Sequence, residues 1–175
     1  NGGDEVSFTP IAGLQGTQIE ISNIFYNVPA RRKFLKKSDT EKKKIVEIVR
    51  RFMLSNPEIS FSLYTDGKEV YSVNASNLEQ RILDIFGKQF KKSLLEVNYE
   101  KKPYSITGFT GNLNTVKKRR GNQYIFLNGR FISDRLLNSA AFSSYKSLIS
   151  RGEFPFFVLF LDVPLNMIDV NVHPA

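Results

Sequence analysis

The sequence predicts a mixed α/β fold, an α+β two-layer sandwich in which helices cover one face of a mixed sheet. Three observations support this prediction. Short segments alternate apolar and polar residues, and two of them end in the hairpin pairs Asp66-Gly67 and Asn128-Gly129. Other segments place their apolar residues on one helical stripe. The stretch 156–163 is almost wholly apolar but too short to cross a bilayer, which predicts a central strand buried on both faces.

The composition favours a phosphate-bearing partner. The 175 residues include 25 Lys and Arg against 17 Asp and Glu, a formal net charge of +8. Such a charge attracts nucleic acid or nucleotide, although a basic surface also serves solubility. With no cysteine and one histidine, disulfides are excluded and a zinc site lacks ligands. Without a membrane-spanning run or a signal-peptide pattern, we expect a soluble cytoplasmic protein with no metal site.

The segment 16–35 is predicted to be a strand that leads into a basic turn. Ile19 and Ile21 alternate with polar residues, as in a half-buried strand. Pro29 cannot donate a ladder hydrogen bond and holds the preceding residue in extended geometry. The strand should therefore end by Asn27, and the cations that follow should lie on a new element.

Two helices are expected to begin at capping boxes. Ser38 and Glu41 open the first helix, and Ser76 and Glu79 open the second. The first helix should bury one apolar stripe, which consists of Ile45, Ile48, Val49, Phe52 and Met53. Between the helices, the first hairpin pair joins two strands. We place a domain boundary near Ala75, which divides the chain into domains 1–75 and 76–175.

The second domain is predicted to hold the mixed sheet and one further helix. The expected strands are 94–99, 104–109, 123–127 and 156–163. A helix with small residues on one face is expected from Asp134 to Ser150, and small residues permit close packing on a sheet. A polar loop at 111–122 carries a run of four cations.

The sequence signatures of common enzyme classes are absent. The chain contains no GxxxxGK[ST], GxGxxG or HExxH segment. Asp162 and Asp169 are best explained by turns, and His173 by a structural hydrogen bond. The cations instead gather after the first strand, on the first helix, in the polar loop and after the second hairpin. This distribution predicts a surface that binds phosphate backbone without reading bases.

Three segments together resemble the MutL family of DNA mismatch-repair ATPases. They are GTQIEISNIFYNVPARRKFLK, FLNGRFISDRLLNSA and DVNVHPA, in this order and spacing. The resemblance implies that residues 1–75 end a GHKL-type ATPase domain and that residues 76–175 form a ribosomal-protein-like transducer domain with a left-handed β-α-β crossover. Two alternatives stay open, namely a transducer fragment of a gyrase-type topoisomerase and a basic RNA-binding module of similar fold.

The resemblance also implies an ATP-driven role in DNA mismatch repair for the parent protein. ATP and Mg²⁺ would close a homodimeric clamp on DNA, and hydrolysis would reopen it. The implied partners are DNA, a MutS-type mismatch-recognition protein and a downstream endonuclease or helicase, at the nucleoid of a bacterial cytoplasm. The family's main catalytic motifs would precede Asn1, and its γ-phosphate lysine would follow Ala175. We therefore expect this fragment to hold no catalytic residue or cofactor, to bind DNA weakly and to transmit nucleotide state.

Site residues fall into three groups. Gly16 and Thr17 match the family's late nucleotide motif, which implies that the Thr17 hydroxyl lies near the nucleotide. Asn171 and His173 belong to a segment expected to report nucleotide state. Candidates for DNA contact, from the resemblance and the cationic clusters together, are Arg31, Arg32, Lys36, Lys117, Lys118, Arg119, Arg120, Arg130 and Arg135.

Overall fold

The structure, a computed structural model, describes residues 13 and 15–168. The chain divides into two units, Asn1–Lys43 and Lys44–Ala175. Helix α2 (Ser38–Ser55) runs across this division.

The smaller unit contains the short helix α1 (Pro29–Lys33), which has proline in its first turn and cations in its last. This confirms that the cations lie on a new element. The strand predicted before α1 is wrong, because described residues 15–28 form only bends, turns and irregular chain. Ile19 and Ile21 are each 78% exposed. A strand needs a neighbour for its N–H and C=O groups, and no described residue pairs with this segment.

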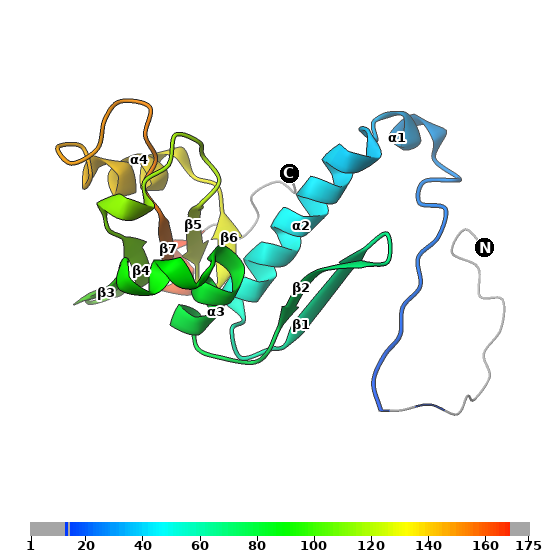
Figure 1. Cartoon of the computed structure of the whole chain (residues 1–175), viewed down its shortest axis with the longest axis horizontal. Coiled ribbons are helices and arrows are strands. Elements are labelled where there is room, and N and C mark those ends of the chain that lie inside the picture. The colour runs from blue at the N-terminus through cyan, green and yellow to red at the C-terminus, as the bar shows by residue number, and fades with distance from the viewer. Residues whose placement is uncertain (1–12, 14, 169–175) are drawn as a thin grey trace. The chain divides into compact units, whose positions relative to one another are not determined.

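In the larger unit, α2 is followed by a two-stranded hairpin, β1 (Phe61–Thr65) and β2 (Lys68–Val73) (Figure 1). The Asp66-Gly67 turn has positive φ at both residues, which confirms the predicted hairpin. The predicted apolar stripe of α2 is only partly buried: Met53 is inaccessible, whereas Ile48 and Phe52 are about half exposed. A helix buries its apolar stripe only where other elements cover it, and Ile48 and Phe52 lack full cover among the described residues.

A five-stranded mixed sheet forms the rest of the unit, with strand order β3-β4-β7-β5-β6. Its strands are β3 (Leu94–Lys101), β4 (Tyr104–Gly111), β5 (Gln123–Leu127), β6 (Arg130–Ile132) and β7 (Phe157–Asp162). Only β5 and β7 pair in parallel, and the other pairs are antiparallel. The apolar stretch thus lies in the centre of the sheet, as its composition predicts.

Two helices pack on this sheet, and each is capped by a side chain. Asn77 caps α3 (Leu78–Phe86), one residue after the serine predicted to begin it. Asp134 caps α4 (Arg135–Ser143), which ends earlier than expected. Short 3₁₀ helices are η1 (Lys88–Lys92), η2 (Leu113–Thr115) and η3 (Leu165–Met167). Among the described helices, none is long and apolar enough to cross a membrane.

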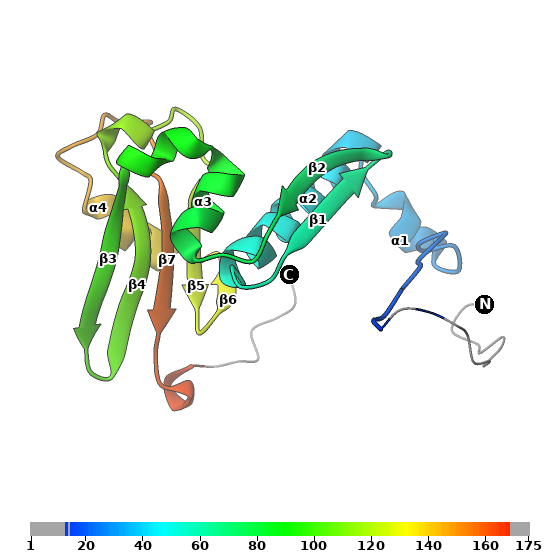
Figure 2. The same ribbon diagram turned by 60° about the horizontal axis from the view of Figure 1, so that its bottom comes forward.

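The helices lie on opposite faces of the sheet, not on one face as predicted (Figure 2). Val158 joins the core formed with α3, whereas the ring of its neighbour Phe157 contacts Phe142 of α4, with centroids 6.1 Å apart. Successive side chains of a strand point to opposite faces, so these contacts place α3 and α4 on different sides. The reason is the apolar composition of β7, which requires cover on both faces.

Candidate nucleic-acid interface

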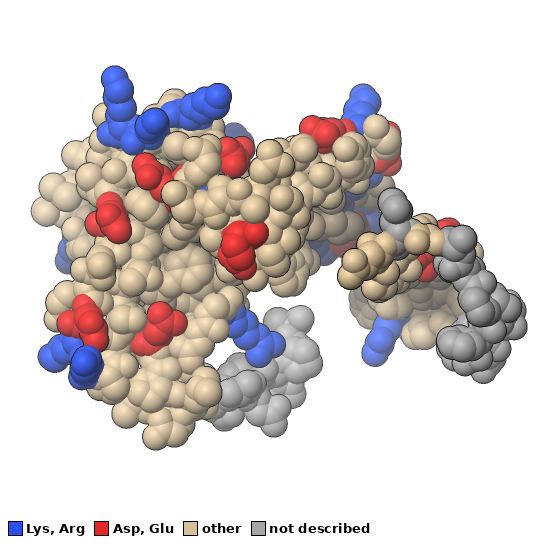
Figure 3. All heavy atoms as spheres, turned by 90° about the horizontal axis from the view of Figure 1, so that it is seen from below, with Lys and Arg blue, Asp and Glu red and all other residues tan. Residues whose placement is uncertain are grey.

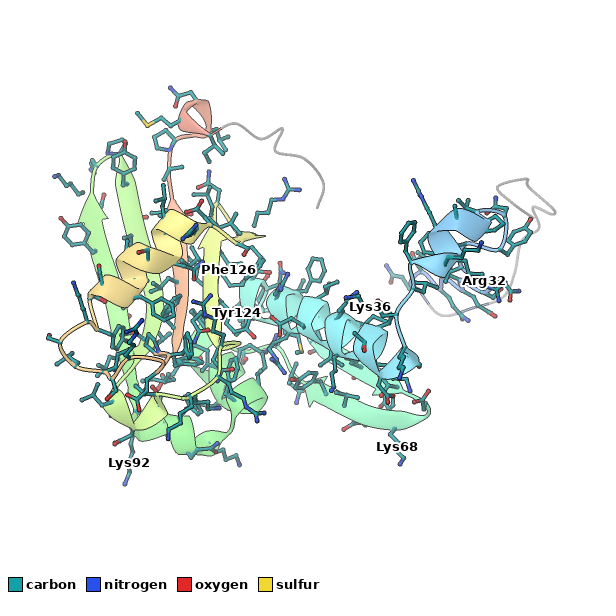
Figure 4. All side chains as sticks on the ribbon, turned by 90° about the horizontal axis from the view of Figure 1, so that it is seen from above. Arg32, Lys36, Lys68, Lys92, Tyr124 and Phe126 are labelled. Carbon is teal, nitrogen blue, oxygen red and sulfur yellow. The ribbon has the colours of Figure 1, made fainter. Side chains whose placement is uncertain are left out.

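In the smaller unit, the predicted site residues are exposed. Gly16 and Thr17 lie in irregular chain before α1, and Arg31 and Arg32 lie in the last turn of that helix. Lys36 is also exposed, and its backbone amide donates to the carboxylate of Glu41 at 3.1 Å (Figure 4 labels Arg32 and Lys36). The signalling candidates Asn171 and His173 lie outside the described residues.

In the larger unit, the cationic loop is held at both ends. The backbone of Lys117 forms an isolated antiparallel bridge with Phe154, with N–O distances of 3.0 and 2.8 Å. The guanidinium of Arg120 lies 5.1 Å from the ring centroid of Phe154. Lys118 and Arg119 lie between these anchors and are exposed. The loop therefore presents its cations from a fixed base.

Arg130 begins the short strand β6, and Arg135 follows that strand. Arg130 follows the Asn128-Gly129 turn, and the side chain of Asn128 exchanges two hydrogen bonds of 2.9 Å with the backbone of Val163. Arg135 is the first residue of α4, after its capping residue. Both arginines are exposed, and their backbone positions are fixed by local hydrogen bonds.

A hollow of about 820 Å³ brings two of the predicted DNA-contact residues together and adds a third arginine. Arg120 comes from the loop, Arg135 from α4, and Arg51 from α2. The predicted candidates did not include Arg51, because the sequence shows it only as one cation of a helical cluster. The other lining residues are Glu47, Gly121, Gln123, Phe131, Ile132, Ser133, Asp134, Asn138, Ser139 and Phe142.

A polar network at one wall of the hollow holds Glu47. The carboxylate accepts from Arg50 at 3.0 Å and from Arg51 at 3.3 Å. The hydroxyl of Tyr124, which Figure 4 shows beside α2, lies 3.3 Å from the same carboxylate and 3.1 Å from the carbonyl oxygen of Gly121. Burial raises the pKa of Tyr124 to about 12, although the hydrogen bond from Arg50 acts in the opposite direction.

The hollow contrasts with the open surface of the larger unit. On the face in Figure 3, lysine and arginine side chains are interspersed with carboxylates, without a continuous basic band. In the hollow, three arginines meet two carboxylates, and both carboxylates already accept hydrogen bonds from the protein. The guanidinium groups can therefore bind an incoming anion, and guanidinium matches phosphate oxygens in geometry as well as in charge.

The chain is similar to known proteins along nearly its whole length. The family described as "DNA mismatch repair protein, C-terminal domain" matches residues 82–175, more than half of the chain. DNA mismatch repair protein MutL of Chlorobium phaeovibrioides is 42% identical over 99% of this chain, and that of Porphyromonas gingivalis is 38% identical over 100%. The chain belongs to the MutL family. The match extends over 28% of the length of each of these relatives.

A solved MutL structure has the same fold as this member of the family. The Aquifex aeolicus MutL ATPase domain complexed with ADP aligns with a TM-score of 0.60 and 31% identity, over 80% of this chain and 50% of that one. The family resemblance and the mixed α/β class predicted from the sequence are thus confirmed. The topoisomerase and RNA-binding alternatives gain no support from these matches. The domain boundary near Ala75 and the left-handed crossover stay predictions.

Proposed function

We propose that this chain is the segment of a MutL protein in which the end of the ATPase domain, residues 1–75, joins the transducer domain, residues 76–175, and that it contacts DNA during mismatch repair. The observation that carries the proposal is the hollow in which Arg51, Arg120 and Arg135 converge. Cations at fixed positions bind backbone phosphates and hold a protein on the duplex without reading its sequence.

Nucleotide binding belongs to the longer protein in this proposal. The similar Aquifex structure holds ADP, and this chain aligns with half of it. We assign ATP and Mg²⁺ to the whole protein and no catalytic residue to this chain. Gly16 and Thr17 would touch the nucleotide, and Asn171 and His173 would report its state. Replacing Thr17 with Val in the full-length protein should lower the affinity for ATP, which equilibrium nucleotide binding would measure, whereas Thr107→Val on β4 should not.

The proposed mechanism is a clamp driven by nucleotide. ATP shifts an open–closed equilibrium only if it binds one state more tightly, so closure of a homodimer around DNA requires that difference in affinity. This chain would carry the change from nucleotide to DNA and bind the duplex weakly. A MutS-type protein would deliver the mismatch and an endonuclease or helicase would follow, at the nucleoid of a bacterial cytoplasm.

A repair assay in cells tests the function. The full-length protein carrying Arg135→Glu should fail to restore a low spontaneous mutation rate in a bacterium that lacks MutL. Arg151→Glu is the matched control, because Arg151 is exposed on the same unit and does not line the hollow. If both variants restore repair as well as the unaltered protein, the assignment of DNA contact to Arg135 is wrong.

A further inference from the structure

Arg51 is held more firmly than the other two arginines of the hollow. Its guanidinium carbon lies 3.9 Å from the ring centroid of Phe131, within cation–π distance. Its Nε donates to a carboxylate oxygen of Glu47 at 3.3 Å. Within the described part of the chain, no hydrogen bond engages its two Nη groups. The guanidinium is thus oriented by two contacts, while its terminal donors are left for a ligand.

The other two cations come from separate elements. Arg120 is the last cation of the loop 111–122 and has its guanidinium over the ring of Phe154, and Arg135 begins α4. The hollow between them is lined by further polar side chains, which are Gln123, Ser133, Asn138 and Ser139. Arginines from a helix, a loop and a second helix thus line one hollow, and a guanidinium group offers paired N–H donors to phosphate oxygens.

The size of the hollow favours a phosphate within a chain over a free ion. Its volume of about 820 Å³ falls in the range of cavities that take drug-sized ligands and far exceeds the space that one phosphate fills. Sugars on either side of a backbone phosphate would occupy the remaining space. The polar side chains of the lining can donate to sugar and phosphate oxygens, which are the usual contacts to a nucleic-acid backbone.

We propose that this hollow seats one backbone phosphate of duplex DNA and that Arg51 is its principal ligand. The inference rests on the proposed function and deepens it by naming the group that is bound and a residue that binds it. Phe131 and Glu47 position Arg51, so that the guanidinium does not have to be ordered when DNA arrives. Arg120 and Arg135 complete the charge around the phosphate.

Duplex binding over a series of salt concentrations tests this proposal. Fluorescence anisotropy with a labelled duplex gives the slope of log affinity against log salt, and loss of one phosphate contact lowers that slope by about 0.9. Arg51→Gln should lower both the slope by that amount and the affinity by about tenfold. Arg51→Lys should keep the slope but bind more weakly than the unaltered chain, since lysine lacks the planar fork. Arg151→Gln, outside the hollow, should match the unaltered chain.

One folding control and three further results separate the outcomes. Thermal melting identifies any loss of folding in Arg51→Gln, and Arg51→Lys then carries the test. If Arg51→Gln and Arg151→Gln weaken binding equally, the attraction is diffuse and the phosphate seat is refuted, although DNA binding stands. If the unaltered chain binds no duplex even at low salt, the proposed function fails as well. If sodium phosphate alone shifts the Arg51 Nε–H resonance as far as DNA does, the hollow is a small-anion site.

Discussion

Two regions of the Lys44–Ala175 unit bury their apolar side chains to very different extents. Around the five-stranded sheet, Tyr124, Phe126, Phe156 and Val158 are each at most 1% exposed. On α2, the described apolar residues include Phe52, which is 57% exposed. One region is closed around an aromatic core, and the other leaves much of its apolar surface open.

This difference indicates that the two regions are stabilised in different ways. Rings pack closely in the sheet region, where Phe126 stacks on Phe160 with centroids 4.8 Å apart. A two-stranded hairpin is marginal alone, and this one is tied to the rest by polar contacts. The fully buried Arg81 of α3 donates to carbonyl oxygens beside the hairpin, at 2.8 Å to Ile59 and 2.9 Å to Asn74. Aromatic packing stabilises the sheet region, whereas buried polar contacts connect the hairpin to α3.

The largest expected effect comes from removing a ring of the sheet core. Phe126→Ala should lower the free energy of unfolding by about 3–5 kcal/mol, because it removes buried area and leaves a cavity among close-packed rings. Urea denaturation would measure this loss. The matched variant Phe52→Ala deletes the same ring from α2, where more than half of it is exposed, and should change stability by no more than about 0.5 kcal/mol.

These two variants test the comparison directly. Similar losses from Phe126→Ala and Phe52→Ala would show that the exposed face of α2 contributes as much to stability as the sheet core does. The contrast between the regions would then be wrong.

A smaller loss is expected from Arg81, the polar connection between the regions. Its Nη groups donate to four carbonyl oxygens within 2.9 Å, from Met53, Pro57, Ile59 and Asn74. Arg81→Met keeps the side-chain length but leaves these carbonyls without their donors, which should cost about 2–3 kcal/mol. Hydrogen exchange should accelerate first in β1 and β2, because their connection to α3 is lost. Mass spectrometry after exchange would locate the effect.

The control for Arg81 is the exposed Arg151, whose replacement by Met should change neither stability nor exchange by a measurable amount. Uniform acceleration of exchange across the sheet in Arg81→Met would contradict the proposed role. It would mean that Arg81 supports the whole unit instead of the hairpin alone.

Local signals in the sequence predicted much of this fold. Both hairpin pairs have the positive φ angles that their residue types favour, and the apolar run became the central strand β7. The predictions that were wrong concern segments whose burial depends on residues far away in the sequence. The alternation at 19–22 meets no pairing strand among described residues, and Ile48 and Phe52 of the predicted stripe of α2 are about half exposed. Periodicity shows that one face of a helix or strand can be buried. Only the tertiary structure supplies the surface that buries this face.

The candidate site was predicted in part for the same reason. Arg120 and Arg135 were predicted, because cations in a loop and after a hairpin can be recognised from the sequence alone. Arg51 was not among the candidates, because its neighbour Phe131 lies 80 residues away in the sequence. Gly108 likewise gives no local signal, yet a methyl group there would overlap the carbonyl oxygen of Val158. The contact between Arg51 and Phe131 and the close approach of the Gly108 and Val158 backbones both follow from the topology of the fold.

The smallest expected effect concerns Tyr124, whose hydroxyl belongs to the second polar connection between the regions, with Arg50 and Glu47. Tyr124→Phe should cost about 1 kcal/mol at neutral pH, because it removes one buried hydroxyl and its hydrogen bonds.

Burial raises the pKa of Tyr124 from 10.0 to about 12. Its stabilising contribution is therefore complete below pH 10 and is lost as the pH rises from 10 to about 12, because the unfolded chain ionises first. Tyr124→Phe should lose less stability than the unaltered chain over that interval, whereas Tyr99→Phe, an exposed control on β3, should follow the unaltered chain. Urea denaturation at several pH values distinguishes these curves, and identical pH dependence in all three proteins would exclude Tyr124 as a buried link between the regions.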